Sequence, residues 1–305
     1  MARGPRERTA PDSLVVVDKP SGMTSHDVVA RVRRLAGTRK VGHAGTLDPM
    51  ATGVLLLGIE RTTRLLGHLA LADKAYLATI RLGVATVTDD AEGEVIAAVD
   101  ASEVTDDDVE RALAPLRGDI LQRPSSVSAI KVDGVRSYTR VREGEDVELP
   151  ERPVTVSRLD VLDVRRATVE HDGTATGAVD VDVHVECSTG TYVRALARDL
   201  GDALGVGGHL TALRRTRVGP FGLDDAVPLA VLEESFTALP LVDVVRALFT
   251  AIDVDDAIAD RVLHGGRLPT VLAPGERAGL FGPDGRVLSV AESQDGQLVP
   301  VVVFS

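Results

Sequence analysis

The sequence predicts an α+β fold built around a largely antiparallel sheet. Apolar runs typical of strands are interleaved with helical patterns along the 305 residues. The predicted strands come in pairs joined by local turn signals, which favours antiparallel hairpins over a doubly wound parallel sheet. The length exceeds what one typical core requires, so we expect two domains.

The N-terminal elements are predicted as follows. Residues 1–12 read as a disordered tail, and Leu14–Val17 is a short buried strand. A helix should follow, with Thr24 or Ser25 as N-cap, because an apolar stripe with helical spacing begins at Val28 and ends before Gly37. The basic residues of this helix lie mostly off the stripe and face solvent or a ligand.

The central part alternates strands and helices. A hairpin is expected around Asp133-Gly134, and the charged, weakly patterned residues 138–150 should be mobile. Arg194 and Arg198 are four residues apart on a predicted helix and therefore share a face. The other predicted elements are strands at 54–57, 76–82, 95–99 and 179–187, and helices at 104–113, stopped by Pro115, and 191–204.

The C-terminal part is predicted to be a small, mostly β domain. The segment 230–241 carries the expected boundary, which divides the chain into a domain at 13–235 and another at 236–305. Two short helical stretches follow. Strands are then expected at 270–272, 286–290 and 298–304, with a turn at Pro283.

Composition excludes several classes of protein. A single cysteine, Cys187, rules out an internal disulfide framework and a cysteine-rich zinc site. No apolar run is long enough for a membrane helix and no signal peptide is evident, so we expect a cytoplasmic protein. The aromatic content of 3% argues against an RNA platform of stacked rings.

The net charge of −12 repels nucleic acid globally, but the charges are clustered. Ten acids and no base lie between residues 89 and 110. Such polarity permits a polyanion on one face; the alternative is two solvated helix faces. The bases gather in two clusters, one of Arg31, Arg33, Arg34, Arg39 and Lys40 and one of Arg214, Arg215 and Arg217.

The loop Gly42–Gly53 is the most informative stretch. Its glycines relax the backbone, and Pro49 disfavours the helical region for Asp48, so this carboxylate is placed to point into a cleft. Carboxylates perform covalent and acid–base chemistry when their surroundings fix their charge. The alternative is an ordinary Asp-Pro turn. His43 and Asp48 lack metal-ligand spacing, and no phosphate-binding glycine motif is present.

Five ordered motifs resemble the TruB family of tRNA pseudouridine synthases. The catalytic motif of that family is matched by Gly42–Gly58, G-H-A-G-T-L-D-P-M-A-T-G-V-L-L-L-G. The N-terminal Lys-Pro motif is matched by Leu14–Met23, and the K-x-Y motif by Lys74–Tyr76. The arginine segment resembles Cys187–Leu200, and the leucine segment resembles Gly207–Arg215.

The resemblance implies roles residue by residue. Asp48 matches the catalytic aspartate, and Arg194 the arginine that pairs with it. Tyr76 matches the tyrosine that stacks on the target base, and Leu213 an apolar wall of the uracil pocket. His43 matches the residue that fills the stack left by the flipped base. The alternatives are a structural ion pair for Arg194, which is compatible with the pairing role, a core position for Tyr76 and Leu213, and a turn histidine for His43.

Lys19 and Pro20 match a motif that packs under the catalytic loop, so we expect them to support the site. The family also implies a pseudouridine synthase core with a central mixed, largely antiparallel sheet, an inserted RNA-clamping thumb at about 123–152, and a small PUA-like C-terminal RNA-binding domain. It implies no metal and no cofactor, since isomerisation is redox-neutral. The expected partner is the T stem-loop of tRNA, whose uridine 55 is isomerised, and we expect a monomer with no obligatory protein partner.

The sequence departs from the family in its acidity, in an extra polar run at 166–177 that suggests a lengthened hairpin, and in a divergent C-terminus. Two alternatives stay open. One is a guide-RNA-dependent synthase of the dyskerin type, against which the thumb segment and the lack of a long basic tail argue. The other is an RNA chaperone, against which the set of Asp48, Tyr76 and Arg194 argues.

Overall fold

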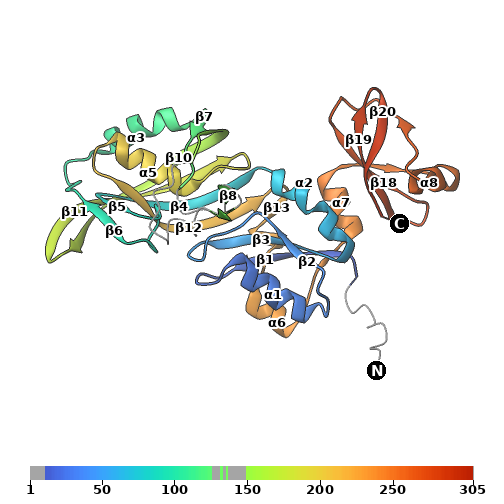
Figure 1. Ribbon diagram of the computed structural model, residues 1–305, viewed down its shortest axis with the longest axis horizontal. Helices are drawn as coiled ribbons and strands as arrows, with labels where there is room; N and C mark the ends of the chain where they lie inside the picture. The colour runs from blue at the N-terminus through green and yellow to red at the C-terminus, as the bar shows by residue number, and fades with distance from the viewer. Residues whose placement is uncertain (1–10, 126–130, 133–134, 137–148, 305) are drawn as a thin grey trace. The chain divides into compact units, whose positions relative to one another are not determined.

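The computed structural model describes residues 11–125, 131–132, 135–136 and 149–304 (Figure 1). The chain forms two compact units: unit 1 comprises residues 1–48, 54–70 and 219–305, and unit 2 comprises residues 49–53 and 71–218. Each unit combines strands and helices, which confirms the predicted α+β class.

Unit 1 contains the N-terminal strands and the helices beside them. The strand order is β14-β1-β3, with β2 added to β3 and β15 added to β1. β1 pairs in parallel with β14 and antiparallel with β15, so the sheet is mixed. The elements are β1 (Ser13–Lys19), α1 (Ser25–Leu35), β2 (Val41–Ala44), β3 (Thr52–Ile59), α2 (Leu66–Leu71), β14 (Val227–Pro228), α6 (Leu229–Glu234), β15 (Leu239–Pro240) and α7 (Leu241–Leu248).

The predicted first helix is confirmed, and its start is set by a capping box. The Thr24 hydroxyl accepts from the Asp27 amide, and the Asp27 carboxylate accepts from the Thr24 amide at 2.9 Å. Val28, Val29 and Val32 are buried, while the arginines of α1 are exposed. Gly37 ends the helix with a φ of 64°, a conformation that glycine adopts without strain.

The N-terminal tail is fixed as far back as Asp12. Residues 1–10 lie outside the described part of the chain. The Asp12 carboxylate accepts hydrogen bonds from the backbone and side chain of Arg61, at 2.8 and 2.6 Å, and the Asp12 carbonyl accepts one from Leu241. Leu239 pairs with Leu14 on β1, so the chain is still part of this sheet within the segment expected to hold the domain boundary.

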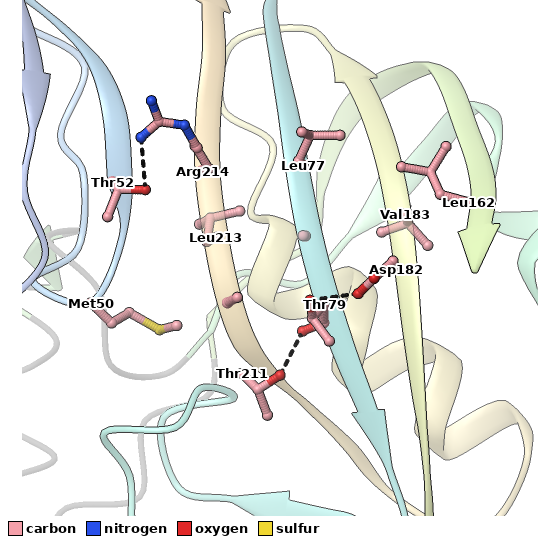
Figure 2. Close-up of a pocket in the computed structure, with 12 residues that line it drawn as sticks. Met50, Thr52, Leu77, Thr79, Leu162, Asp182, Val183, Thr211, Leu213 and Arg214 are labelled. Atoms are coloured by element: carbon pink, nitrogen blue, oxygen red, sulfur yellow. Dashed lines mark hydrogen bonds between the residues drawn. The ribbon is translucent and has the colours of Figure 1, made fainter. Parts of the chain in front are cut away.

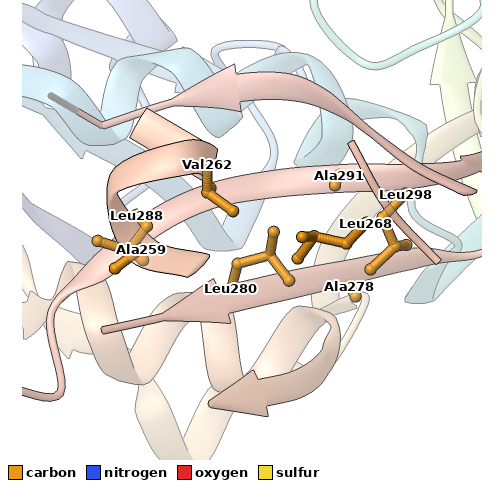
Figure 3. Packing of buried hydrophobic residues seen from close by; sticks show 8 residues of the cluster. All are labelled: Ala259, Val262, Leu268, Ala278, Leu280, Leu288, Ala291 and Leu298. Carbon is orange, nitrogen blue, oxygen red and sulfur yellow. The ribbon is translucent and has the colours of Figure 1, made fainter. Parts of the chain in front are cut away.

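A separate small sheet lies at the C-terminus, in the strand order β16-β18-β19-β20-β17. Helix α8 covers its core, in which Val262 of the helix meets Leu280 and Leu288 of the strands (Figure 3). The elements are β16 (Thr250–Asp253), α8 (Asp256–Leu263), β17 (Leu268–Pro269), β18 (Arg277–Phe281), β19 (Val287–Gln294) and β20 (Gln297–Val303).

The last two predicted strands are confirmed as β19 and β20, and the predicted turn at Pro283 leads into β19. The strand predicted at 270–272 is wrong: β17 ends at Pro269, and Val271 is fully exposed. β16 and β18 were not predicted. β18 carries no alternating polar pattern, because both of its faces are covered: Ala278, Leu280 and Phe281 are all buried. β16 has only four residues, three of which are exposed.

Unit 2 is built on the strand order β12-β4-β11-β10-β7. All four of these pairings are antiparallel; residues 52–53 of β3 add a short parallel pairing with β12. The elements are β4 (Lys74–Leu82), β5 (Val84–Thr86), β6 (Val95–Ala98), α3 (Asp106–Leu113), β7 (Gly118–Gln122), β8 (Lys131–Val132), β9 (Val135–Arg136), β10 (Arg152–His171), β11 (Thr174–Cys187), α5 (Val193–Ala203) and β12 (Gly208–Val218).

Helix α5 packs against β4 and β12, and α3 packs against α5 (Figure 1). Two glycines allow α5 to approach β12 closely. A Cβ atom added to Gly201 would lie 2.2 Å from the carbonyl carbon of Gly207, and one added to Gly208 would lie 2.5 Å from the oxygen of Ala197. Backbone therefore meets backbone at this crossing, which fixes the position of α5 on the sheet.

Two predicted hairpins are confirmed. The polar run at 166–177 lengthens β10 and β11, which join through a two-residue turn at Asp172-Gly173 with φ values of 49° and 75°. β8 pairs with β9 as expected, although the turn residues 133–134 lie outside the described residues. Of the predicted thumb at 123–152, only residues 123–125, 131–132, 135–136 and 149–152 are described, and the predicted mobile segment 138–150 lies mostly outside them.

Candidate active site

Asp48 lies in the loop between β2 and β3, where it is half-buried. The preceding residue fastens this loop to the start of α1. The Leu47 amide donates to the Ser25 hydroxyl at 2.9 Å, and that hydroxyl donates to the Leu47 carbonyl at 3.1 Å. Ser25 and Leu47 are both buried. The Ser25 hydroxyl therefore holds both the amide and the carbonyl of Leu47, the residue directly before Asp48.

Sequence reasoning considered Ser25 only as a possible helix cap and missed its contact with the Asp48 loop. We expected either Thr24 or Ser25 to cap the helix, and the structure gives the cap to Thr24. Ser25 is thereby available to hold the loop. The contact joins residues 22 positions apart, and no local pattern in the sequence predicts it.

His43 lies on β2, opposite Leu57 of β3, and is half-buried. Its ring meets that of His26 edge to face, with centroids 5.4 Å apart and planes at 80°. His26 is exposed on α1. The imidazole of His43 is thus oriented by a second aromatic ring from the helix that also holds the Asp48 loop.

Lys19 and Pro20 end β1. The Lys19 side chain is completely buried, and its Nζ donates to the Pro20 carbonyl at 2.8 Å. Pro20 itself is exposed. A buried ammonium that bonds the adjacent backbone stabilises the turn that leads from β1 to α1. This arrangement is what a supporting residue requires.

In unit 2, Tyr76 and Leu213 lie on the same face of the sheet. Tyr76 of β4 is opposite Arg215 of β12, and Leu213 is opposite Ala78, two residues beyond Tyr76. Tyr76 is 7% exposed and Leu213 is 8% exposed. The two side chains therefore offer a small aromatic and aliphatic surface at the edge of a packed core.

Two cationic side chains close to Tyr76 in the sheet are buried. Arg215 is 1% exposed and Lys74 is 7% exposed. Burial, reinforced by the positive charge of Arg215, lowers the pKa of Lys74 to about 8. Its Nζ donates to the Ala72 carbonyl at 2.7 Å. Gly53, with a φ of 98°, passes directly over Arg215: an added Cβ would lie 2.1 Å from the Arg215 carbonyl oxygen.

Arg194 lies near the start of α5 and is 5% exposed. Its Nη1 donates to the Thr88 carbonyl at 2.7 Å and lies 3.3 Å from the Asp90 carboxylate. Asp90 is also buried, and its other oxygen accepts from the Thr88 hydroxyl and from the Glu92 amide. Arg194 is thus held by a satisfied turn at residues 88–92.

Asp90 was missed by sequence reasoning, which noted the ten acids between residues 89 and 110 but singled out none of them. Asp89 and Asp90 are buried in the structure, whereas Asp106–Asp108 form the first turn of α3, capped by Thr105. No local signal separates the two buried acids from the exposed ones, since their partners lie far along the chain. The predicted pairing of Arg194 with Asp48 stays a prediction, because Asp48 belongs to unit 1.

A shallow pocket of about 430 Å³ opens on unit 2 (Figure 2). Of the candidate site residues, Leu213 lines it. The Thr79 hydroxyl donates to Asp182, and the Thr211 hydroxyl donates to the Thr79 carbonyl across its floor. Met50 and Thr52, which follow Asp48 in the chain, line its edge, and Arg214 reaches Thr52 at 3.4 Å.

The two basic clusters have different surroundings. In the first, Arg33, Arg34, Arg39 and Lys40 are exposed at the end of α1 and just beyond it. The second cluster is not a solvent-facing patch: Arg215 is buried, and Arg217 pairs with Glu186 at 2.7 Å. Alternation along β12 puts Arg214 and Arg215 on opposite sides of the sheet, and a register shift after Arg215 puts Arg217 on the side away from it.

Within the described residues, no group of three or more histidine, cysteine, aspartate or glutamate side chains is placed to hold a metal ion. Over the same part of the chain, no helix has both the length and the apolar character needed to span a membrane.

Comparisons with known proteins cover nearly the whole chain. Residues 33–193 match the model of the TruB family pseudouridylate synthase N-terminal domain, and residues 194–278 match that of the tRNA pseudouridylate synthase B C-terminal domain. The tRNA pseudouridine synthase B of Streptomyces griseus is 56% identical over 299 residues, 98% of this chain and 99% of the relative. That of Streptomyces avermitilis is 58% identical over 296 residues, 96% of this chain and 97% of the relative.

The chain is also similar to solved structures. The chain resembles one in the crystal structure of a Cbf5-Nop10-Gar1 complex with a TM-score of 0.70 and 25% sequence identity, covering 99% of this chain and 87% of that one. It also resembles a chain in an H/ACA RNP bound to a substrate RNA containing 2′-deoxyuridine, with a TM-score of 0.69 and 24% identity over 96% of this chain and 85% of that one. The second likeness is one of fold.

Proposed function

Since the chain belongs to the TruB family of pseudouridylate synthases, we propose that it converts the uridine at position 55 in the T loop of tRNA to pseudouridine. In this isomerisation the bond between uracil N1 and ribose C1′ breaks, and a bond between uracil C5 and C1′ forms. The C5 proton leaves and N1 gains a proton, so the reaction is redox-neutral. It requires a group that attacks the nucleoside and a pocket that retains the detached base.

Asp48 supplies the attacking carboxylate in this proposal. The observation that carries it is the double hydrogen bond between Ser25 and Leu47, which holds the backbone immediately before Asp48. A preorganised nucleophile loses little freedom on approaching the substrate, and this lowers the barrier. The preceding glycine Gly45 has a φ of 83° and Pro49 follows, so the loop conformation is restricted on both sides.

In this proposal, Arg194 pairs with the carboxylate of Asp48. A guanidinium has five N–H donors in a fixed plane, so one arginine can serve Asp90 and a second carboxylate together. Its attachment to Thr88 and Asp90 sets the plane of that guanidinium before substrate binds. A lysine would offer one point charge without this geometry.

Recognition and extrusion of the target base are assigned to Tyr76, Leu213 and His43. Tyr76 stacks on the uracil and Leu213 forms an apolar wall, in agreement with their shared face of the sheet. His43 fills the gap left in the RNA stack, which offsets part of the few kcal/mol that base extrusion costs. Lys19 and Pro20 support the site from the end of β1.

The wider proposal is a monomeric, cytoplasmic enzyme that works on the T stem-loop without a protein partner or a guide RNA. The thumb at 123–152 and the PUA-like residues 236–305 provide further RNA contacts. The identity of 53–58% to enzymes named tRNA pseudouridine synthase B, over nearly their full length, favours this standalone activity over the guide-dependent alternative.

The test is to incubate the purified protein alone, in EDTA, with an unmodified tRNA transcript and to map pseudouridine at nucleotide resolution. Conversion confined to the T-loop uridine is the expected result. Conversion at another uridine would contradict the proposed site. Binding without any conversion would contradict the standalone enzyme and favour a guide-dependent synthase or an RNA chaperone.

A further inference from the structure

The chain that leaves β7 is joined to α5 at two successive places and to Asp89, in the turn that holds Arg194, at a third. Gln122 ends β7, and its amide group accepts from the Tyr192 amide at 2.8 Å and donates to the Tyr192 carbonyl at 3.1 Å. The Arg123 carbonyl accepts from Arg198 at 2.8 Å. The Ser125 hydroxyl donates to Asp89 at 2.6 Å. Tyr192 is the N-cap of α5, so the Gln122 side chain holds the backbone of the residue at which the helix begins.

These groups are buried and mutually satisfied. Ser125 is 0% exposed, Gln122 is 2% exposed and Asp89 is 9% exposed. Burial raises the pKa of Asp89, while Ser125, Arg198 and Arg194 act in the opposite direction. Asp89 also has a φ of 59°, in the left-handed region that side chains other than glycine adopt at a cost. A strained residue with a buried charge persists where its partners hold it.

The same turn and the same helix hold Arg194. Asp89 precedes Asp90, and Arg198 lies one helical turn beyond Arg194 on the same face of α5. Two ion pairs therefore run side by side, Arg194 with Asp90 at 3.3 Å and Arg198 with Asp89 at 3.4 Å. One pair alone would let α5 pivot about it; the second pair fixes the rotation of the helix relative to the turn.

We propose that Asp89 and Arg198 are positioning residues, which lock α5 to the 88–90 turn and to the chain leaving β7 and so set the guanidinium of Arg194 for catalysis. This inference rests on the proposed function. Neither side chain has a role in the reaction itself. An error of about 1 Å in the position of Arg194 is enough to reduce the rate roughly 100-fold.

Asp89→Asn is the informative variant. Asparagine tolerates the left-handed backbone and keeps an oxygen for Ser125, but it removes the charge that pairs with Arg198. Asp180→Asn is the matched control: Asp180 is a partly buried carboxylate in the same unit, and its ion-pair partner, at 2.7 Å, is Arg81 of β4 instead of a residue of α5 or of the turn. For each variant, the single-turnover rate of pseudouridine formation, the tRNA Kd and the thermal midpoint are measured.

We expect Asp89→Asn to lower the single-turnover rate about 10-fold or more while the tRNA Kd changes less than about 3-fold. Repeated in an Arg194→Lys background, the same substitution should lower the rate less than about 2-fold, because the guanidinium to be positioned is gone. Asp180→Asn should leave the rate unchanged. If Asp89→Asn lowers the thermal midpoint so far that the variant is not folded in the assay, Ser125→Ala replaces it. The expectation is the same: a lower single-turnover rate with a nearly unchanged tRNA Kd.

Equal losses in the two backgrounds would overturn the inference, since Asp89 would then act independently of Arg194. A loss of tRNA affinity that matches the loss of rate would also overturn it. An unmodified tRNA left unconverted by the wild-type protein would overturn the proposed function itself, and the positioning role with it.

Discussion

At the scale of single residues, Asp48 is the side chain on which the chemistry depends. In Asp48→Asn the amide has nearly the same shape but neither attacks the nucleoside nor accepts its proton, so the rate should fall more than about 1,000-fold. The tRNA affinity should stay within a few-fold, because no phosphate contact is lost. Pseudouridine mapping and filter binding measure the two quantities. Retained turnover would remove Asp48 from its proposed role.

Lys74 gives a prediction about pH. Its pKa of about 8 in the folded protein lies below the ordinary value of 10.5, so between these pH values the unfolded chain binds a proton that the folded chain does not. The free energy of unfolding should therefore rise with pH in this window, by up to about 1.4 kcal/mol per unit. Urea unfolding of wild type and Lys74→Met from pH 7.5 to 10.5 measures the difference. A difference that does not change with pH would mean that Lys74 stays charged.

Residue predictions from sequence succeeded where the signal was local. The spacing of Arg194 and Arg198 predicts a common helix face, and α5 confirms it. Their partners Asp90 and Asp89 could not be predicted, because burial by distant segments distinguishes them from the exposed acids that follow. Arg215 illustrates the reverse: a cluster of three arginines predicts a basic patch, but a strand turns the middle one into the core.

At the scale of elements, the crossing of α5 over β12 decides where Arg194 lies. Gly201→Ala usually favours a helix by about 0.5–1 kcal/mol, yet here the Cβ would meet the Gly207–Gly208 backbone at 2.2 Å. We expect destabilisation by about 1–3 kcal/mol and a loss of rate, as α5 lifts from the strand. Gly67→Ala is the control, since Gly67 is on helix α2 with nothing within 4 Å. Urea unfolding compares them, and equal stabilities would contradict the close crossing.

Helix and strand boundaries could likewise be predicted where neighbouring residues determine them, and not where contacts with distant segments do. The capping box at Thr24 and the Asp172-Gly173 turn are encoded within a few residues, so the helix and the long hairpin were predicted correctly. β18 was missed because packing makes it a strand: the Cβ of a residue at Gly279 would meet Val245 at 2.4 Å. Such contacts from α7 leave no alternating pattern in the sequence.

At the scale of the whole molecule, the problem is how a chain of net charge −12 binds a polyanion. Long-range repulsion is screened beyond about 8 Å at physiological salt, so local clusters decide the contact. In the described part of the chain, the exposed bases at the end of α1 form such a cluster, while Arg217 is occupied by Glu186. We therefore expect RNA phosphates to meet Arg33, Arg34, Arg39 and Lys40.

This assignment predicts that tRNA affinity falls steeply with salt concentration and that removing a single positive charge makes the fall less steep. The logarithm of the tRNA association constant should fall linearly with the logarithm of salt concentration, and Arg34→Ala or Lys40→Ala should reduce the slope by roughly 0.7–0.9 each. Arg111→Ala is the control: Arg111 is exposed on α3 and pairs with Asp108 in the acidic run. Filter binding from about 50 to 300 mM salt measures the slopes. If Arg34→Ala and Lys40→Ala gave the same slope as wild type, the RNA phosphates would have to meet another face, and release of RNA counterions by the bases at the end of α1 would no longer explain how an acidic protein retains tRNA.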